Sequence, residues 1–231
     1  MQTIQFKQLS EQALFVQFGS IMNEQIQNQI QHAMNALLQQ PFPGLIEIVP
    51  SYTNFCIYYD PFIVQKRLPQ ASTISEQVQN YVMTLLSTYK QAPAITRRII
   101  EIPVIYGGDY GPDLQEVADY NLLTTEEVIK RHTSRDYLVY MLGFAPGFPY
   151  LGGLDERIAT PRRATPRLEI AAGSVGIGGT QTGIYPFATP GGWQIIGRTM
   201  TALFSLQQQP PSLLQAGDRV RFIAVKEDSS C

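Results

Sequence analysis

The sequence predicts an α+β fold in two parts, a small layer of helices and strands over residues 1–95 and a β-rich domain over residues 96–231. Up to residue 95, segments with the alternation of strands are interleaved with two segments of helical period. After residue 137, short apolar runs are interrupted by Gly and Pro, which is typical of a closed or sandwiched β structure. A chain of 231 residues is long enough for two such domains.

The first part reads as strand, strand, helix, strand, strand, helix. Strands are expected over residues 4–6, 13–18, 45–49 and 54–59. Asn23 is expected to cap the first helix, and Thr73 with Glu76 three residues later forms a capping box that opens the second. Asp60 and Pro61 are expected to close the second pair of strands. This order predicts a small α+β layer.

The second part begins with a strand and two short helices. The helices are predicted over residues 113–120 and 124–132, and Thr124 with Glu127 forms the capping box of the second. Strands are expected over residues 97–106, 137–142, 168–171, 174–177, 194–197, 201–206 and 219–225.

Charge and cysteine content exclude several classes of protein. The net charge is -2 and no long run of Lys or Arg occurs, which argues against nucleic-acid binding. Cys56 and Cys231 are the only cysteines, so we expect neither a disulfide framework nor a metal site. The chain shows neither a signal peptide nor an apolar stretch of membrane-spanning length, and we expect a soluble, cytoplasmic protein.

Candidate chemistry is concentrated over residues 143–199. The run GFAPGFPYLGGL over residues 143–154 packs aromatic residues among turn residues, as either a tightly folded loop at the edge of the core or the wall of a pocket. The run TPRRATPR over residues 160–167 brings Arg162, Arg163 and Arg167 together, either as an anion site or as a salt-bridged surface strip. Its position beside the other motifs favours the anion site.

A glycine-rich run and the only tryptophan follow. The run GSVGIGGTQTG over residues 173–183 either presents backbone N–H groups as an anion-binding nest or forms glycine-rich β-turns. It matches neither the dinucleotide fingerprint nor a P-loop. Trp193, with Arg198 shortly after it, suits either a core position or a small polar ligand.

His32 and His132 are the only histidines, so any imidazole acid or base is one of them. We expect His32 to be an exposed residue in the middle of a helix. His132 ends a predicted helix, where it either caps the helix dipole or takes part in proton transfer.

Eight motifs between residues 106 and 199 together resemble the family of the 5-oxoprolinase B subunit, also called KipI or allophanate hydrolase subunit 1. In chain order they are YGGDYGPDL (106–114), RH (131–132), GFAPGFPYLGGL (143–154), PRRATPR (161–167), AGSVG (172–176), QTGIYP (181–186), PGGW (190–193) and IGRT (196–199). Residues 1–95 resemble the family only in general pattern.

The resemblance implies a ferredoxin-like N-terminal domain followed by a cyclophilin-like β-barrel C-terminal domain. It also implies two partners, the C and A subunits of 5-oxoprolinase, with which such proteins open 5-oxoproline to glutamate with ATP, and with Mg in the complex. No cofactor is expected to stay firmly bound to the isolated chain. The alternative is inhibition of a sensor histidine kinase, as for KipI. Carboxyltransfer, as in urea carboxylase, is disfavoured because the chain has no Met-Lys-Met biotin motif.

The resemblance also implies where the chemistry occurs. A lactam amide is a poor electrophile, and phosphorylation of its carbonyl oxygen would supply a leaving group whose charge preorganised donors stabilise. The predicted catalytic residues are His132, Asp113, Arg162 and Arg167, with no general base assigned among them. The predicted substrate- or phosphate-binding residues are Arg163, Gly173, Ser174, Gly176, Gln181, Thr182, Tyr185, Trp193 and Arg198.

Overall fold

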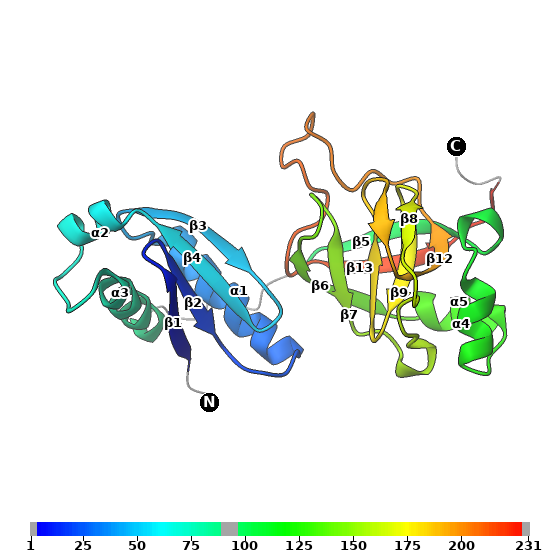
Figure 1. Ribbon diagram of the computed structural model, residues 1–231, viewed down its shortest axis with the longest axis horizontal. Coiled ribbons are helices and arrows are strands. Elements are labelled where there is room, and N and C mark those ends of the chain that lie inside the picture. The colour runs from blue at the N-terminus through cyan, green and yellow to red at the C-terminus, as the bar shows by residue number, and fades with distance from the viewer. Residues whose placement is uncertain (1–3, 89–96, 228–231) are drawn as a thin grey trace. The chain divides into compact units, whose positions relative to one another are not determined.

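The computed structural model of the protein describes residues 4–88 and 97–227 (Figure 1). The chain divides into two compact units, Met1–Thr96 and Arg97–Cys231. The boundary predicted at residue 95 lies outside the described residues, and so does Cys231.

The first unit is a layer of antiparallel strands with helices. Its sheet has the order β1-β2-β4-β3, and every described pairing in it is antiparallel. The strands are β1 (Gln5–Ser10), β2 (Ala13–Gln17), β3 (Leu45–Pro50) and β4 (Asn54–Tyr59). The helices are α1 (Glu24–Gln39), α2 (Pro61–Arg67) and α3 (Ile74–Thr88). Apolar side chains of all three helices and the sheet form one buried core.

Two of the predicted helix starts in this unit are confirmed, and one element was missed. The Asn23 side chain accepts from the amide of Ile26, and Thr73 and Glu76 make both bonds of a capping box. The predicted end of the strand pair at Asp60 and Pro61 is confirmed, because β4 ends at Tyr59, but helix α2, which begins there, was missed. Asp60 accepts from two amides of that helix, and Pro61 occupies a first-turn position whose N–H would have no helical partner.

The second unit contains a closed barrel with the strand order β10-β7-β6-β13-β5-β12-β9 (Figure 1). Strands β13 and β5 run parallel, and the other described pairs are antiparallel. The strands are β5 (Ile99–Tyr106), β6 (Asp136–Leu142), β7 (Pro149–Gly152), β9 (Ser174–Gly178), β10 (Gln181–Ile184), β12 (Gln194–Arg198) and β13 (Arg219–Ala224). The predicted β-barrel is confirmed, whereas the names ferredoxin-like and cyclophilin-like stay predictions.

Shorter elements surround the barrel. Helices α4 (Leu114–Tyr120) and α5 (Thr125–Thr133) pack against each other, and the predicted Thr124–Glu127 capping box opens α5. Strands β8 (Arg167–Ile170) and β11 (Thr189–Gly191) form a separate two-stranded sheet. Two 3-10 turns, η1 (Gly108–Tyr110) and η2 (Glu156–Ile158), complete the described elements.

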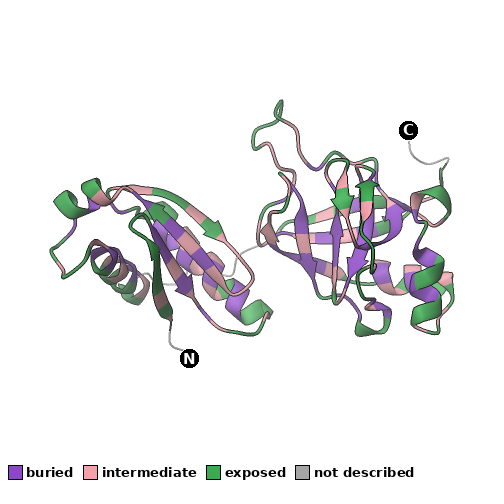
Figure 2. Ribbon diagram, viewed as in Figure 1, coloured by how far each residue is buried: buried purple, intermediate pink, exposed green. Residues whose placement is uncertain are grey.

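The barrel encloses the larger apolar core, and Figure 2 shows the buried residues following its strands. The strand predicted over residues 201–206 is wrong, because this segment contributes a single bridge between Phe204 and Ser212. Leu206 is exposed, and the polar residues 207–209 with Pro210 and Pro211 follow it, so no strand can continue there.

Truncation of Phe222 on β13 tests the barrel core, because this side chain is fully buried. We expect Phe222→Ala to lower the free energy of unfolding of this unit by about 3–5 kcal/mol. Urea unfolding followed by the fluorescence of Trp193, the only tryptophan, measures it. The control is Ile223→Ala on the same strand, whose side chain is exposed. Equal losses in both variants would contradict the assigned core.

Candidate functional site

The carboxylate of Asp113 holds residues 160–167, called here the arginine-rich loop, against the barrel. Arg167 donates to it in a bidentate pair, Nη1 to Oδ2 and Nη2 to Oδ1, both at 2.7 Å. Arg163 adds a third guanidinium bond at 2.9 Å, and the backbone amide of Ile195 on β12 donates at 2.6 Å. The carboxylate is buried at the start of α4. One charged side chain thus joins a helix, a loop and a barrel strand.

These contacts revise the interpretation of the loop. The Asp113 carboxylate forms ion pairs with both Arg163 and Arg167, and its hydrogen bond raises the pKa of the Arg167 guanidinium. Both guanidiniums are partly buried, whereas Arg162, the residue before Arg163, is exposed. The structure therefore shows an internal salt-bridge cluster at Arg163 and Arg167 and leaves Arg162 facing solvent.

Two polar residues that the sequence analysis missed extend this cluster. Glu116 accepts from Arg163 through Oε2 at 3.3 Å and from the Gln194 amide through Oε1 at 3.2 Å. Gln194 also donates to the carbonyl of Pro161 at 3.3 Å. The spacing of Asp113 and Glu116, three residues apart at the start of a helix, is the signal that could have revealed two carboxylates on one face.

Trp193 lies beneath Arg162. The guanidinium carbon of Arg162 is 5.8 Å from the centroid of the indole ring, within the range of a cation–π interaction. The indole is almost fully buried. It packs on β9 and β10, where a Cβ added at Gly178 would come within 2.6 Å of the ring and one at Gly183 within 3.0 Å. Positions 178 and 183 therefore require glycine, because any larger residue would clash with the indole ring.

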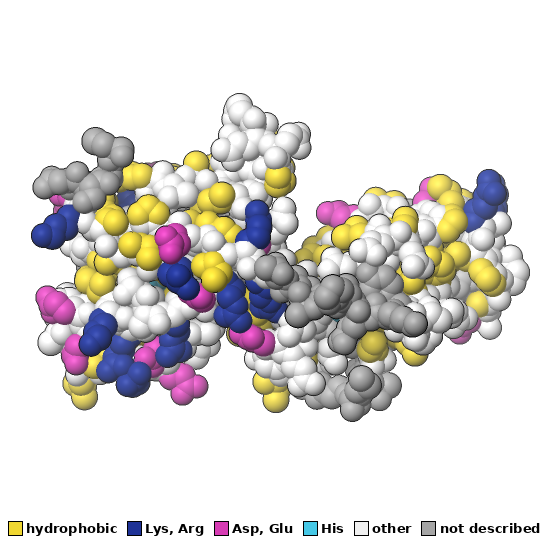
Figure 3. Space-filling view, turned by 180° about the vertical axis from the view of Figure 1, so that it is seen from behind, with side chains coloured by type: hydrophobic (Ala, Val, Ile, Leu, Met, Phe, Trp, Pro, Cys, Tyr) yellow, Lys and Arg dark blue, Asp and Glu magenta, His cyan; other side chains and the backbone are white. Residues whose placement is uncertain are grey.

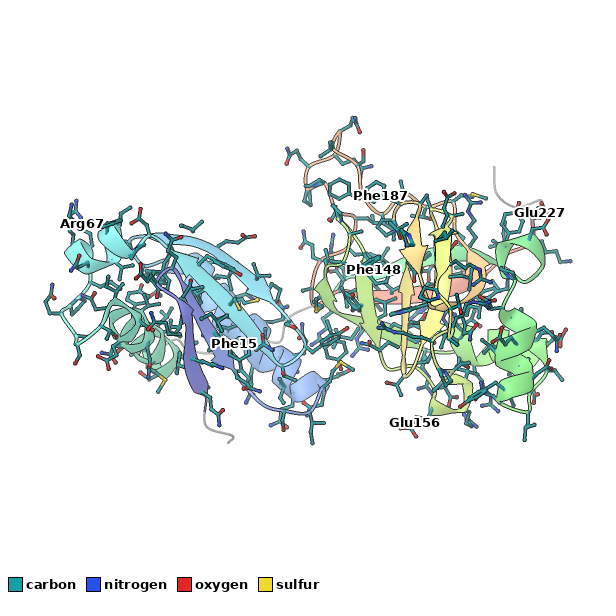
Figure 4. The ribbon with its side chains drawn as sticks, in the orientation of Figure 1. Phe15, Arg67, Phe148, Glu156, Phe187 and Glu227 are labelled. Carbon is teal, nitrogen blue, oxygen red and sulfur yellow. The ribbon has the colours of Figure 1, made fainter. Side chains whose placement is uncertain are left out.

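An aromatic cluster surrounds the indole. Phe148 is 5.6 Å from Trp193 between ring centroids and 5.2 Å from Tyr185, and both contacts are edge-to-face. Burial raises the pKa of the Tyr185 hydroxyl. Phe144 packs its edge on Phe148 but is itself 64% exposed, in the left-handed conformation with φ of 68°. Phe148 is labelled in Figure 4. Arg162 and these rings make the candidate site.

In the glycine-rich run, the amides of Gly173 and Ser174 donate within the fold and are not presented as an anion-binding nest. Gly173 donates to the carbonyl of Tyr185 at 2.7 Å, and Ser174 donates to that of Ala171 at 3.2 Å. Gly176 lies within β9, which pairs with β10 and β12. Gly173 has φ of +80°, and a Cβ there would lie 2.0 Å from the Thr199 carbonyl oxygen. Only glycine, which has no Cβ, allows the backbone at residue 173 to pass this close to Thr199.

Other predicted site residues lie in different contacts. The Nε of Arg198 donates to the carbonyl of Ala172 at 2.8 Å, which supports the turn before β9. Gln181 begins β10, and the next residue, Thr182, is buried and contacts His132. Their proposed contacts with substrate or phosphate stay predictions.

His132 is fully buried between α5 and the barrel strands. The Thr182 hydroxyl donates to the Gly176 carbonyl at 3.0 Å, so it accepts from Nε2 of His132 at 2.9 Å. The Nδ1 atom then accepts from the Tyr106 hydroxyl at 2.7 Å. The ring also stacks on Phe222, 4.5 Å between centroids. Both ring nitrogens are thus engaged, and the imidazole joins α5 to β5, β10 and β13.

Burial lowers the pKa of His132 to about 3. The unfolded chain, with an ordinary histidine pKa near 6.5, binds this proton first as the pH falls, so acid destabilises the folded state between pH 6.5 and about 3. We expect His132→Gln to remove up to about 1.4 kcal/mol per pH unit of that slope. Urea unfolding of the variant and the wild type at several pH values measures it. An unchanged slope would contradict a buried neutral imidazole.

Removal of the Asp113 carboxylate tests the salt-bridge cluster. We expect Asp113→Ala to lower the free energy of unfolding by about 3–5 kcal/mol, because Arg167 loses its bidentate carboxylate and Arg163 keeps only Glu116. The control is Asp136→Ala, which removes the partner of Arg221, a guanidinium that is 40% exposed, and should cost under about 1 kcal/mol. Similar losses in thermal or urea unfolding would show that the Asp113 cluster is an ordinary surface ion pair.

In the part of the chain that the structure describes, neither a metal cluster nor a membrane-spanning helix accompanies the site. Over residues 4–88 and 97–227, no three His, Cys, Asp or Glu side chains are grouped so as to bind a metal ion. In the same ranges, every helix is too short or too polar to span a bilayer.

The fold and site define a two-unit protein in which an α+β layer precedes a closed barrel carrying an arginine-rich loop. The family model described as carboxyltransferase domain, subdomain C and D, matches residues 4–214. The chain belongs to this family, which its relatives show to include the B subunit of 5-oxoprolinase.

Two curated relatives and one solved structure are similar over most of the chain. The 5-oxoprolinase B subunit of Bacillus subtilis is 52% identical over 225 residues, covering 96% of this chain and 93% of the relative. The Haemophilus influenzae B subunit is 48% identical over 198 residues, covering 86% and 88%. The crystal structure of TTHA0988 is 34% identical with a TM-score of 0.79, and the match covers 93% of this chain but 40% of that one.

Proposed function

We propose that this chain is the B subunit of an ATP-dependent 5-oxoprolinase, which acts with the C and A subunits in the cytoplasm to open 5-oxoproline to glutamate. The observation that carries the proposal is the identity of 46–52% with three proteins named as the B subunit of 5-oxoprolinase. The range that matches the family model, residues 4–214, includes the arginine-rich loop, the glycines beside Trp193 (Gly178 and Gly183) and the aromatic cluster around that indole.

The chemistry of the site agrees with a small anionic substrate. Arg162 presents a guanidinium beside the buried indole of Trp193, a combination that suits a compact molecule with an apolar ring and a negatively charged group. Arg163 and Arg167 are held by Asp113, and we assign them the role of positioning Arg162. ATP, with Mg, supplies the activating phosphoryl group in the assembled complex.

His132 has a supporting role in this proposal. Its pKa of about 3 and its two engaged nitrogens leave it neutral at physiological pH, and it is fully buried. It therefore fixes α5 on the barrel, and we assign no general base to this chain.

The direct experiment is reconstitution with omission. Glutamate release and ATP hydrolysis are measured with 5-oxoproline and all three subunits, and then with each subunit left out in turn. We expect activity that requires this chain. Full activity without it would overturn the proposal, and inhibition of a cognate sensor histidine kinase at stoichiometric concentration would then favour the KipI-like alternative.

Substitution of Arg162 tests the site itself. We expect Arg162→Ala to fold, to assemble with its partners and to lower turnover about 100-fold, as the loss of a charge-assisted contact to the reacting species does. Arg221→Ala is the matched control, since it removes an arginine side chain that is 40% exposed and pairs with Asp136 on the barrel. Full activity of the Arg162 variant in the complete complex would contradict the assignment.

A further inference from the structure

A second cluster of charges surrounds a hollow between helix α5 and the 3-10 turn η2. The hollow has a volume of about 220 Å³. Its charged lining residues are Glu127, Lys130, Arg131, Arg135, Asp155 and Arg157. Figure 3 shows Lys and Arg side chains gathered on the lower part of the barrel unit, where these elements lie. In Figure 4, Glu156 of η2 and Phe187 lie at opposite ends of this unit.

One buried carboxylate, that of Asp155, organises this cluster and takes most of its hydrogen bonds from one arginine. Arg157 donates to Asp155 in a bidentate pair, Nε to Oδ1 at 3.0 Å and Nη2 to Oδ2 at 2.7 Å, and its backbone amide also donates to Oδ1. These bonds hold the pKa of the Asp155 carboxyl well below its usual range. The carboxylate has little capacity left for further guanidinium groups.

Two more arginines face the same carboxylate at longer distances. The Nη1 of Arg131 donates to Oδ2 of Asp155 over a long 3.5 Å, and Nη2 of Arg135 lies 3.7 Å from the same oxygen. The Nε of Arg131 is buried and finds no acceptor among the described residues. Arg135 makes one further bond, to the Gly153 carbonyl at 3.1 Å. Each guanidinium has five N–H groups, and the contacts of Arg131 and Arg135 use only some of them. Apart from the buried Nε of Arg131, the remaining donors are available to a second anion.

The charge balance indicates which anion fits. Four cationic side chains face two carboxylates in the lining, an excess of two positive charges. A phosphate group carries about -1.5 to -2 charges at pH 7, which matches this excess better than a single carboxylate does. The volume of the hollow, about 220 Å³, is below the range of about 300–1,000 Å³ for drug-sized ligands, so a small anion fits it better than a large molecule does.

A simpler role explains only part of the cluster. Basic residues at the C-terminal end of a helix offset its dipole, and Lys130 and Arg131 occupy the last turn of α5. Arg135 lies beyond that helix, and Arg157 belongs to η2. Both approach the same hollow from separate segments, which dipole compensation does not require.

We infer that this hollow binds a phosphate group, either free phosphate or the phosphate of a small metabolite, at a site separate in its residues from the Arg162 site. Arg131 and Arg135 would donate to the phosphate oxygens, while Asp155 and Arg157 hold the hollow open. The inference does not depend on the proposed 5-oxoprolinase activity, and its test uses this chain alone.

Isothermal titration of the full chain with inorganic phosphate at pH 7, against chloride of equal ionic strength, tests the inference. We expect saturable binding, about tenfold weaker in Arg135→Gln and in Arg131→Gln, because each loses charge-assisted donors. Arg221→Gln, a partly exposed arginine paired elsewhere on the barrel, should bind as the wild type does. Acetate should bind more weakly than phosphate.

Three results would overturn the inference: no saturable phosphate binding by the wild type, unchanged binding in Arg135→Gln, or acetate binding as tight as phosphate. Arg131 is partly buried, so Arg131→Gln is interpreted only when its thermal unfolding matches the wild type. Arg135 is 41% exposed, and its variant keeps the test decisive if the Arg131 variant does not fold. Titration with a nucleoside monophosphate then distinguishes free phosphate from a phosphate carried on a larger molecule.

Discussion

The Asp113 carboxylate is the interaction on which the candidate site depends. A buried carboxylate is costly unless its charge is compensated, and here two guanidiniums and a backbone amide surround it. Since those partners come from the arginine-rich loop and from β12, neutralising this one charge also fixes the loop on the barrel. The exposed position of Arg162 follows from the way Arg163 and Arg167 are held.

The buried indole of Trp193 lies beneath the arginine-rich loop, under the guanidinium of Arg162. Glycines of β9 and β10 leave room for the ring, and Arg163 donates its backbone amide to the carbonyl of Gly192, the residue before the tryptophan, at 2.7 Å. The loop and the aromatic cluster therefore stabilise each other. Polar and apolar parts of the site are built by the same few segments, which explains why Gly, Pro, Arg and aromatic residues occur so close together in the sequence.

The sequence predicted the elements whose signals are local. Capping boxes at Thr73 and Thr124 and the cap at Asn23 identified helix starts because each bond joins residues three apart. The Gly and Pro spacing predicted a closed or sandwiched β structure, and the family resemblance implied a β-barrel. The short strands β7, β10 and β11 were missed because two to four paired residues carry no clear alternation.

The site was predicted less completely, because its decisive contacts join distant residues. Asp113 and Arg167 are 54 positions apart, so no spacing rule pairs them. Asp113 keeps the loop over Trp193, and acrylamide quenching of this tryptophan tests that role directly. We expect Asp113→Ala, while still folded, to expose the indole, with stronger quenching and red-shifted emission. Emission and quenching equal to those of the wild type would contradict the claim.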